Sequence, residues 1–358
     1  MPKTHLCARP DCGKVCPAKQ KYCGDECLAL AQAARIPPKL AERIRLEDRF
    51  LARAADYLKH HPGRTLKLAP YKSRAKHSSP HEMVLMMSDA HFSEVVDPDV
   101  AMGLKYNEDI ATRRIARMRD VTLRYKQLRE ASYPIRKLTV AMLGDMLSGD
   151  IHEELEITNE SPLPVALVKL AYILHDAMLS FAQEFPEVEL VVIPGNHPRT
   201  KIKPRNKQKT TTNFEYILGH FIAALSQGAY KVQVPKDLIY VHQVFGWRLG
   251  MAHGDAVKSN SFAGIPFYGL RQRREALQAL FRHLSLPQID VLLMGHFHQP
   301  TVLEGTDSTV IINGAIKGGD EYSLNNFLSS NDPVQYLLTF HEKHGLTDYS
   351  RINLKGVK

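Results

Sequence analysis

The chain has 358 residues, of which 44% are hydrophobic and 24% are charged. This composition is typical of a globular protein and excludes a disordered or fibrous one. No run of 18 or more apolar residues occurs, so we predict no membrane span and no membrane partner. The start, MPKTHLCARPDC, lacks the apolar run of a secretion signal, and we therefore expect a cytoplasmic location.

The net charge of +9 is concentrated near the N-terminus. Residues 1–80 contain 17 Lys and Arg against 7 Asp and Glu, whereas residues 81–358 contain 30 against 31. Such an asymmetry favours a polyanionic partner, most often nucleic acid. The alternative is a basic arm that only keeps the protein soluble.

All five cysteines lie within the first 27 residues. This clustering is typical of a metal site in a reducing compartment, because disulfides of secreted proteins are usually spread through the fold. We predict one structural zinc over residues 1–30, in a module that resembles the small treble-clef fingers; its ligands are Cys7, Cys12, Cys23 and Cys27. The fifth, Cys16, either replaces Cys12 or takes no part. The alternative is five reduced cysteines without metal.

Residues 31–80 are predicted to form a basic helical arm and a linker. Apolar and basic positions alternate at helical spacing until Pro37 and Pro38 interrupt them. The composition then changes to Pro, Lys, Ser and His without periodicity, which is typical of a linker.

Residues 81–358 contain short apolar runs, and most of these end in a polar cluster. Helical patterns lie between them at about 104–131, 163–185 and 267–284, so we predict an α/β fold in which each run is a strand. The final run, PVQYLLTF, is predicted to close the sheet. Sites in such folds gather beyond the carboxyl ends of the strands. Five clusters stand at those ends: Asp89-Ala-His91, Gly144-Asp145, Gly195-Asn196-His197, His253-Gly-Asp255 and Gly295-His296-Phe-His298.

These clusters combine carboxylate and imidazole, the ligands that suit manganese, iron, zinc and related divalent ions. In order and type they resemble the calcineurin-like metallophosphoesterase superfamily, over roughly residues 83–345. The resemblance implies a four-layer αββα sandwich with two divalent metals, for which we expect Mn and keep Fe, Zn, Ni and Mg open. It places one metal on Asp89, His91, Asp145 and His298, and the second on Asp145, Asn196, His253 and His296.

The resemblance also assigns the catalytic roles. Asp145 would bridge the two metals, which activate a hydroxide for attack on phosphorus. His197 would contact the phosphate and assist the leaving oxygen, since an imidazole has a pKa near neutral pH. Many relatives have an acid after Gly-Asn-His, where this chain has Pro198. Others have an acid or histidine three residues after the bridging Asp, where this chain has Ser148. Either Asp150 or His152 takes over the task of orienting His197 or the substrate, or both are helix-capping or surface residues.

A basic loop follows the third cluster and reads PRTKIKPRNKQKTTTN. Its cations would gather a phosphate backbone over the metals; they are Arg199, Lys201, Lys203, Arg205, Lys207 and Lys209. The alternative is a solvated surface loop. Three aromatic residues either stack on bases or pack in the core: Tyr106, Phe262 and Tyr268.

Three functions remain open from the sequence. The first is a two-metal nuclease that hydrolyses phosphodiesters in nucleic acid, similar to the exonuclease subunits of the SbcD type. The second is a phosphodiesterase for cyclic nucleotides or a phosphomonoesterase, and the third a catalytically idle nucleic-acid-binding module. The strings SGDIHEEL and YNEDIA resemble a phage-encoded branch of the superfamily, which would place the protein in the host cytoplasm. A homodimer stays open, because nothing in the sequence fixes the oligomeric state.

Overall fold

The structure of the protein is a computed structural model that describes residues 4–6, 15–17, 79–203, 206–257, 266–306, 308–328 and 330–357. The chain divides into two compact units, Met1–Pro62 and Gly63–Lys358. In the first unit, β1 (Thr4–Leu6) pairs antiparallel with β2 (Val15–Pro17), and the Cys16 side chain is buried. The four predicted zinc ligands, Cys7, Cys12, Cys23 and Cys27, lie outside the described residues, as does the predicted arm up to residue 78.

The second unit contains a six-stranded sheet in the order β13-β12-β3-β4-β5-β6. Neighbouring strands from β3 to β6 are parallel, so their carboxyl ends share one edge, whereas β12 runs antiparallel to both β3 and β13. The strands are β3 (His81–Met87), β4 (Ile135–Met142), β5 (Glu187–Val192), β6 (Lys231–Gln233), β12 (Val334–His341) and β13 (Gly345–Asn353).

A second sheet of five strands has the order β10-β11-β9-β8-β7. Its three inner strands, β8, β9 and β11, are parallel, while β7 and β10 are antiparallel edges. The strands are β7 (Tyr240–Val244), β8 (Trp247–Met251), β9 (Val291–Met294), β10 (Thr301–Leu303) and β11 (Thr309–Ile312).

The two sheets pack face to face around one apolar core. Val84 and Leu338 of the first sheet share a buried cluster with Leu249 and Leu293 of the second. Successive side chains of a strand point to opposite faces, so Leu85 is buried on the other face of the first sheet. Each sheet therefore needs a cover on its outer face.

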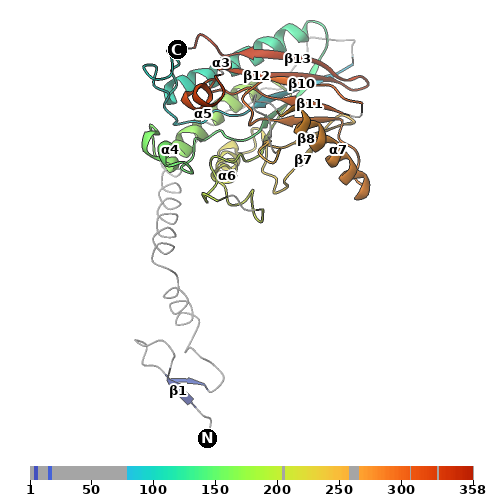
Figure 1. The fold of residues 1–358 in the computed structure, drawn as a ribbon. Coiled ribbons are helices and arrows are strands. Elements are labelled where there is room, and N and C mark those ends of the chain that lie inside the picture. The colour runs from blue at the N-terminus through green and yellow to red at the C-terminus, as the bar shows by residue number, and fades with distance from the viewer. Residues whose placement is uncertain are drawn as a thin grey trace. The chain divides into compact units, whose positions relative to one another are not determined.

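Helices provide that cover. Helices α3 (Glu108–Glu130), α5 (Leu163–Glu184) and α6 (Phe214–Ser226) contact the strands of the first sheet, and α7 (Phe267–His283) packs on the second. Figure 1 shows α7 and α5 on opposite sides of this unit. The predicted α/β sandwich with four layers is confirmed, as are the helices expected at about 104–131, 163–185 and 267–284.

Helix α5 is long and apolar enough to cross a membrane by length and composition. Much of its most apolar window is buried inside the protein, with Leu167, Leu170 and Leu174 at 1% exposure or less. It contacts α3, α6 and β5. The apolar character of α5 therefore belongs to a core helix of the sandwich.

Several elements were not predicted, including α6, β7, β13 and two short helices, α4 (Glu153–Thr158) and α8 (Glu321–Phe327). The prediction that PVQYLLTF is a strand is confirmed, but the prediction that it closes the sheet is wrong. This segment is β12, which lies between β3 and β13, and β13 forms the edge. Alternating polar residues in GLTDYSRIN suit an edge strand with one solvated face.

Replacement of Leu338 by Ala tests the contact between the sheets. This side chain is fully buried in the shared core, so the change should lower the free energy of unfolding by about 2–5 kcal/mol. Urea denaturation measures the loss. Leu128→Ala is the control, because Leu128 is 61% exposed on α3 and should cost no more than about 0.5 kcal/mol. Equal losses in both variants would contradict the core described above.

Candidate metal centre

The loops that follow β3, β4, β5, β8 and β9 meet beyond the carboxyl ends of these strands. Their main chains are joined directly, since Asp89 N donates to Gly144 O at 3.0 Å and His91 N donates to Asp145 O at 2.9 Å. In the second sheet, Gly295 N donates to the main-chain oxygen of His253 at 2.9 Å. The five predicted clusters thus form one site at the junction of the two sheets.

Many residues of this site have a left-handed backbone. Five of the predicted ligands have φ between 44° and 73°, namely Asp89, His91, Asp145, His296 and His298. This conformation is costly for residues other than glycine and persists where the surrounding structure imposes it, often at functional sites. The fold therefore holds these side chains in orientations that a relaxed loop would not adopt.

Three glycines let the loops approach one another. A Cβ on Gly195 would lie 2.1 Å from Oδ1 of Asp145, and one on Gly295 would lie 2.7 Å from Oδ2 of Asp89. A Cβ on Gly144 would lie 2.6 Å from Nδ1 of His253. These distances are shorter than atoms tolerate, so the space next to the carboxylates exists only because these positions are glycine.

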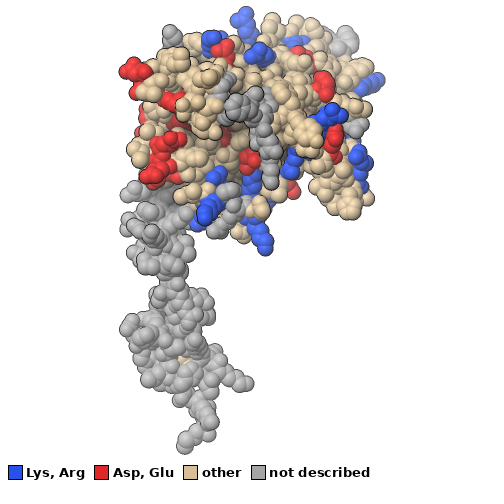
Figure 2. All heavy atoms as spheres, viewed as in Figure 1, with Lys and Arg blue, Asp and Glu red and all other residues tan. Residues whose placement is uncertain are grey.

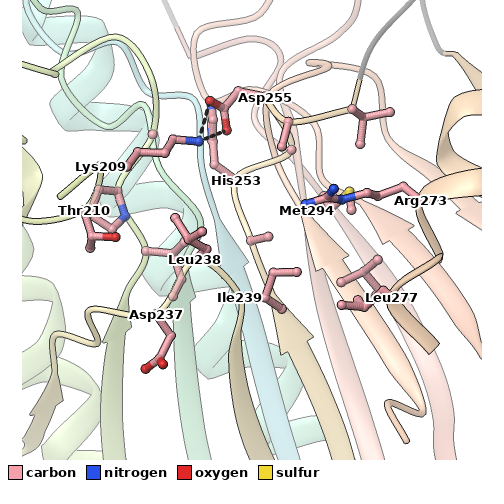
Figure 3. Close-up of a pocket in the computed structure, with 18 of the residues that line it drawn as sticks. Lys209, Thr210, Asp237, Leu238, Ile239, His253, Asp255, Arg273, Leu277 and Met294 are labelled. Atoms are coloured by element: carbon pink, nitrogen blue, oxygen red, sulfur yellow. Dashed lines mark hydrogen bonds and ion pairs between the residues drawn. The ribbon is translucent and has the colours of Figure 1, made fainter. Parts of the chain in front are cut away.

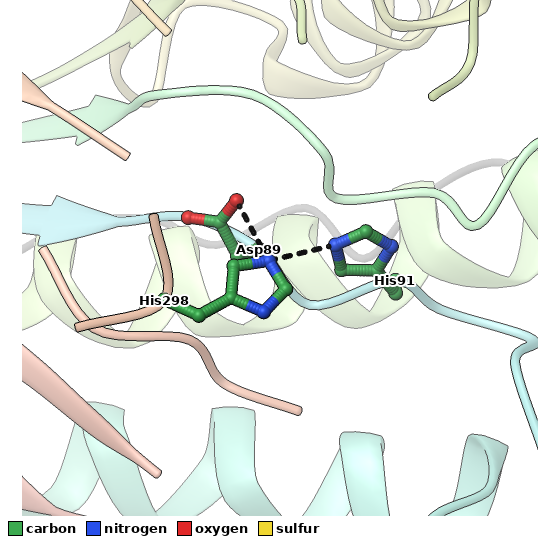
Figure 4. Close-up of side chains that lie close together, drawn as sticks. All are labelled: Asp89, His91 and His298. Atoms are coloured by element: carbon green, nitrogen blue, oxygen red, sulfur yellow. Dashed lines mark hydrogen bonds and ion pairs between the residues drawn. The ribbon is translucent and has the colours of Figure 1, made fainter. Parts of the chain in front are cut away.

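The first group of side chains is Asp89, His91 and His298. Nε2 of His298 lies 3.2 Å from Nε2 of His91 and 3.4 Å from Oδ1 of Asp89, so the three side chains point to one centre (Figure 4). Asp89 is fully buried, and its carboxylate also accepts a hydrogen bond from the main chain of His296. Such an arrangement of imidazole and carboxylate fits a divalent cation.

The second group is Asp145, His253 and His296. Nε2 of His253 lies 2.9 Å from Oδ2 of Asp145 and 3.0 Å from Oδ1 of Asn196, which joins this amide to the group. Nδ1 of His253 donates to the main-chain oxygen of Leu143 at 2.7 Å. That contact turns Nε2 towards the group, as the outer contacts of metal-binding histidines commonly do.

Asp145 connects the two groups, because it also lies within ligand distance of His91 and His197. Burial raises the pKa of Asp145, but the nearby imidazoles outweigh burial and hold it well below its usual value. For His253, burial lowers the pKa, and the Asp145 carboxylate outweighs it and raises the pKa to about 10. Asp145 and His253 thus form a buried pair of opposite charge, in which a bound cation would take the place of the shared proton.

His197 lies beside both groups and is held from two sides. Its main-chain N donates to Oδ1 of Asp145 at 2.8 Å, and its ring Nδ1 donates to the main-chain oxygen of Ser148 at 3.1 Å. Burial is the main reason why the pKa of His197 is lowered. The contact expected from a side chain of Asp150 or His152 is therefore made by a carbonyl of the main chain. The His152 ring is exposed, with its centroid 5.5 Å from that of His197.

Glu215 is a buried residue of the site that the sequence analysis missed. Its two carboxylate oxygens accept hydrogen bonds from the main-chain N of Met146 and, at 2.7 Å, from that of Gly195. Burial, with a further contribution from Asp145, raises the pKa of Glu215 to about 8. Glu215 lies two residues after Asn213, whose side chain caps α6. This capping pattern was the sequence signal that could have placed Glu215 in the first turn of a helix.

The basic loop lies beside Asn196, but not all of its cations face outward. The Arg199 guanidinium donates to main-chain oxygens of Asn196, Lys201 and Ile202, and the Lys209 ammonium donates to both oxygens of Asp255 (Figure 3). Arg199 and Lys209 therefore hold the loop in place. Arg205 lies outside the described residues.

A cavity of about 290 Å³ lies beside His253, and the Lys209–Asp255 pair is part of its lining (Figure 3). A smaller cavity of about 30 Å³ adjoins Asn196 and is lined by Arg199, Lys201, Lys203 and Lys209. Figure 2 shows Lys and Arg at the lower edge of this unit, near the segment before α6, and Asp and Glu around α4. The four basic side chains that line the smaller cavity form a positively charged rim beside the second group of candidate ligands.

The three aromatic residues considered for base stacking differ in position. Tyr106 is buried, and its hydroxyl donates to the main-chain oxygen of Ala90, so Tyr106 is a core residue and not a stacking platform. Tyr268 on α7 is 74% exposed. Phe262 lies outside the described residues.

No family model matches the sequence, and no curated protein does either. Similar solved structures include zinc-bound Vps29 from Entamoeba histolytica (13% identity, TM-score 0.28, 76% of this chain and 99% of that one). An archaeal phosphodiesterase (10%, 0.34, 76% and 99%) and the E. coli phosphoesterase YfcE (12%, 0.33, 76% and 100%) are also similar. These likenesses are too distant to assign a reaction, and the assignment below rests on the side chains of this chain.

Gly195→Ala tests the close packing of the loops. Its Cβ would collide with Asp145, so the change should weaken Mn²⁺ binding at least about tenfold by displacing the carboxylate that connects the two groups. Isothermal titration calorimetry measures the binding. Gly246→Ala is the matched control, since a Cβ there meets no atom within 4 Å. Unchanged binding in Gly195→Ala would mean that the loops can separate without loss.

Proposed function

We propose that this protein is a two-metal-dependent phosphodiesterase that acts on nucleic acid. The observation that supports the proposal is the convergence of side chains from five separate loops on two adjoining groups that share access to Asp145. One metal would be held by Asp89, His91, Asp145 and His298, and the other by Asp145, Asn196, His253 and His296. This is the pattern of the calcineurin-like metallophosphoesterases that the sequence resembles.

The residues fit two divalent cations on chemical grounds. Buried carboxylates and imidazoles lie within contact distance of one another, and like groups of this kind tolerate such proximity when a cation lies between them. When bound, the two cations supply positive charge to the phosphoryl group and make a water molecule nucleophilic near neutral pH. Asp145 can serve both, since one carboxylate has enough lone pairs for two cations.

His197 is the candidate proton donor to the leaving oxygen. Its Nδ1–H is committed to the Ser148 carbonyl, so the proton for the leaving oxygen is the one that Nε2 holds in the charged ring, a form that burial disfavours and the Asp145 carboxylate favours. The hydrogen bond from its main chain to Asp145 fixes its place beside the predicted metals. General acids of this kind contribute about 10²–10⁴ in rate.

The positively charged rim favours nucleic acid as the substrate. Lys203 and Lys207 are exposed, and Lys201 lines the cavity beside Asn196, so a chain of phosphates could contact them while one phosphodiester reaches the metals. The basic excess in residues 1–80 adds to this attraction.

A small phosphodiester is the second candidate. It is favoured by the engagement of Arg199 and Lys209 in contacts within the protein, which reduces the number of cations available to a long polyanion. Such a substrate needs the same metals and the same histidine but no rim.

His197→Ala should lower kcat about 10²–10⁴-fold on bis(p-nitrophenyl) phosphate with Mn²⁺. The two metals should remain bound, because His197 is not among their proposed ligands. Activity and metal content per chain are measured on the same sample. Full activity in this variant would exclude His197 as the proton donor. If the wild-type protein shows no Mn²⁺-dependent activity on any phosphoester, the third function, a catalytically idle nucleic-acid-binding module, is the one that remains.

Replacement of both Lys201 and Lys203 by Glu distinguishes a nucleic-acid substrate from a small phosphodiester. Cleavage of single-stranded and duplex DNA should fall at least about tenfold, and the slope of log affinity against log salt should decrease by about 1 for each lost phosphate contact. Hydrolysis of bis(p-nitrophenyl) phosphate should change less than about threefold. If a cyclic nucleotide is consumed and the wild-type protein cleaves neither DNA nor RNA, the small-substrate function is correct.

A further inference from the structure

Lys317 is a fully buried lysine next to the metal centre, in the loop between β11 and α8. Its ammonium donates to both oxygens of Glu94, at 2.8 Å and 3.0 Å, and to Oδ2 of Asp320. Asp320 also begins α8, where its side chain accepts a hydrogen bond from the main chain of Ser323. These three charged side chains, Glu94, Lys317 and Asp320, are called the buried triad below.

The loop that carries Lys317 is hydrogen-bonded to the loop that carries Asp89, the first proposed ligand in the chain. Lys317 N donates to the main-chain oxygen of Asp89 at 3.2 Å, and Arg114 on α3 donates to the main-chain oxygens of Ile316 and Lys317. The buried triad therefore has a defined position relative to Asp89. Its three side chains are buried and cannot separate as a surface ion pair can.

The triad contacts the ligand His91 on the side away from its neighbours in the site. Oε2 of Glu94 lies 3.5 Å from Nδ1 of His91, and this buried nitrogen makes no hydrogen bond among the described residues. Nε2 of the same ring faces His298. Glu94 is thus a carboxylate within reach of Nδ1 of His91.

The charges of the triad hold Glu94 in place. Two carboxylates share one ammonium, and Oε2 of Glu94 is the triad oxygen that lies next to Nδ1 of His91. Burial disfavours the charged form of Lys317, but Glu94 and Asp320 outweigh burial and raise its pKa above its usual value. The lysine therefore keeps its charge and holds Glu94 in place.

We propose that Glu94, held by Lys317 and Asp320, is a positioning residue that keeps the proton of His91 on Nδ1 and turns Nε2 towards the metal. The inference rests on the proposed function, in which His91 is a metal ligand. Ligand histidines generally donate their second N–H to such a partner, and loss of the partner typically weakens metal binding 10–100-fold.

A second buried ion pair provides the matched control. Lys126 and Glu130 pair on α3, with side chains 2% and 8% exposed, against 3% and 7% for Lys317 and Glu94. Variants of both pairs remove a lysine-paired carboxylate from a side chain of similarly low exposure. Their effects on folding should be alike, and only the triad should affect metal binding.

The test is Mn²⁺ titration of the full chain by calorimetry, with Glu94→Leu compared with Glu130→Leu. We expect binding to weaken 10–100-fold in Glu94→Leu and less than about threefold in Glu130→Leu. Equal affinity of Glu94→Leu and the wild type would overturn the proposal. If Glu94→Leu does not fold, Glu94→Gln is used, because it keeps the shape of the side chain. A loss of Mn²⁺ affinity of threefold or more in Glu94→Gln that is absent from Glu130→Gln supports the proposal. Unchanged affinity in Glu94→Gln overturns it.

A double-mutant cycle shows whether Glu94 acts through His91. In a His91→Gln background, Glu94→Leu should cause less than about a twofold further loss of affinity. A full, additive loss would mean that Glu94 acts on the site by another route and would overturn the proposal. The wild-type titration distinguishes failure of the Glu94 proposal from failure of the proposed function, because a wild-type protein that binds no Mn²⁺ contradicts the proposed function itself.

Discussion

The site depends on how closely the loops at the ends of the strands can approach one another. At Gly195 and Gly295 the main chain lies directly against the carboxylates of Asp145 and Asp89, in space that a methyl group would fill. Main-chain hydrogen bonds between the loops and left-handed residues within them maintain this approach. A group of acids and histidines on longer, looser loops would spread apart by repulsion between like charges, whereas here the two sheets fix the origin of every loop.

Charge balance is the second condition that shapes this region. Asp89, Asp145, Glu94 and Glu215 are all buried, and isolated carboxylates are strongly disfavoured away from water. The protein meets this condition differently at each position. Asp145 lies next to histidines, Glu94 next to Lys317, and the raised pKa of Glu215 favours its neutral form at neutral pH. Differences among these surroundings explain why residues of the same type have different roles within one site.

The sequence allowed prediction of those site residues that occur in short motifs of neighbouring residues. The clusters around Asp89, Asp145 and His253 could be located because each follows an apolar strand, and parallel strands end at the same edge. Glu215 and Lys317 could not be found in this way, because their importance arises from burial and from partners far along the chain. Arg199 and Lys209 were counted as free cations for the same reason, since neither their carbonyl acceptors nor Asp255 could be assigned to them from spacing alone.

The position of β12 has a consequence for the order of events during synthesis on the ribosome. Every candidate ligand has been translated once His298 is complete, yet β3, which precedes Asp89, pairs with β12 only after residue 341. Gln335 at the start of β12 also accepts a hydrogen bond from the main chain of Ser88. A nascent chain that stops short of this strand therefore has all its candidate ligands but leaves one side of β3 unpaired, so the loop that carries Asp89 should become fixed only when the last part of the chain has been made.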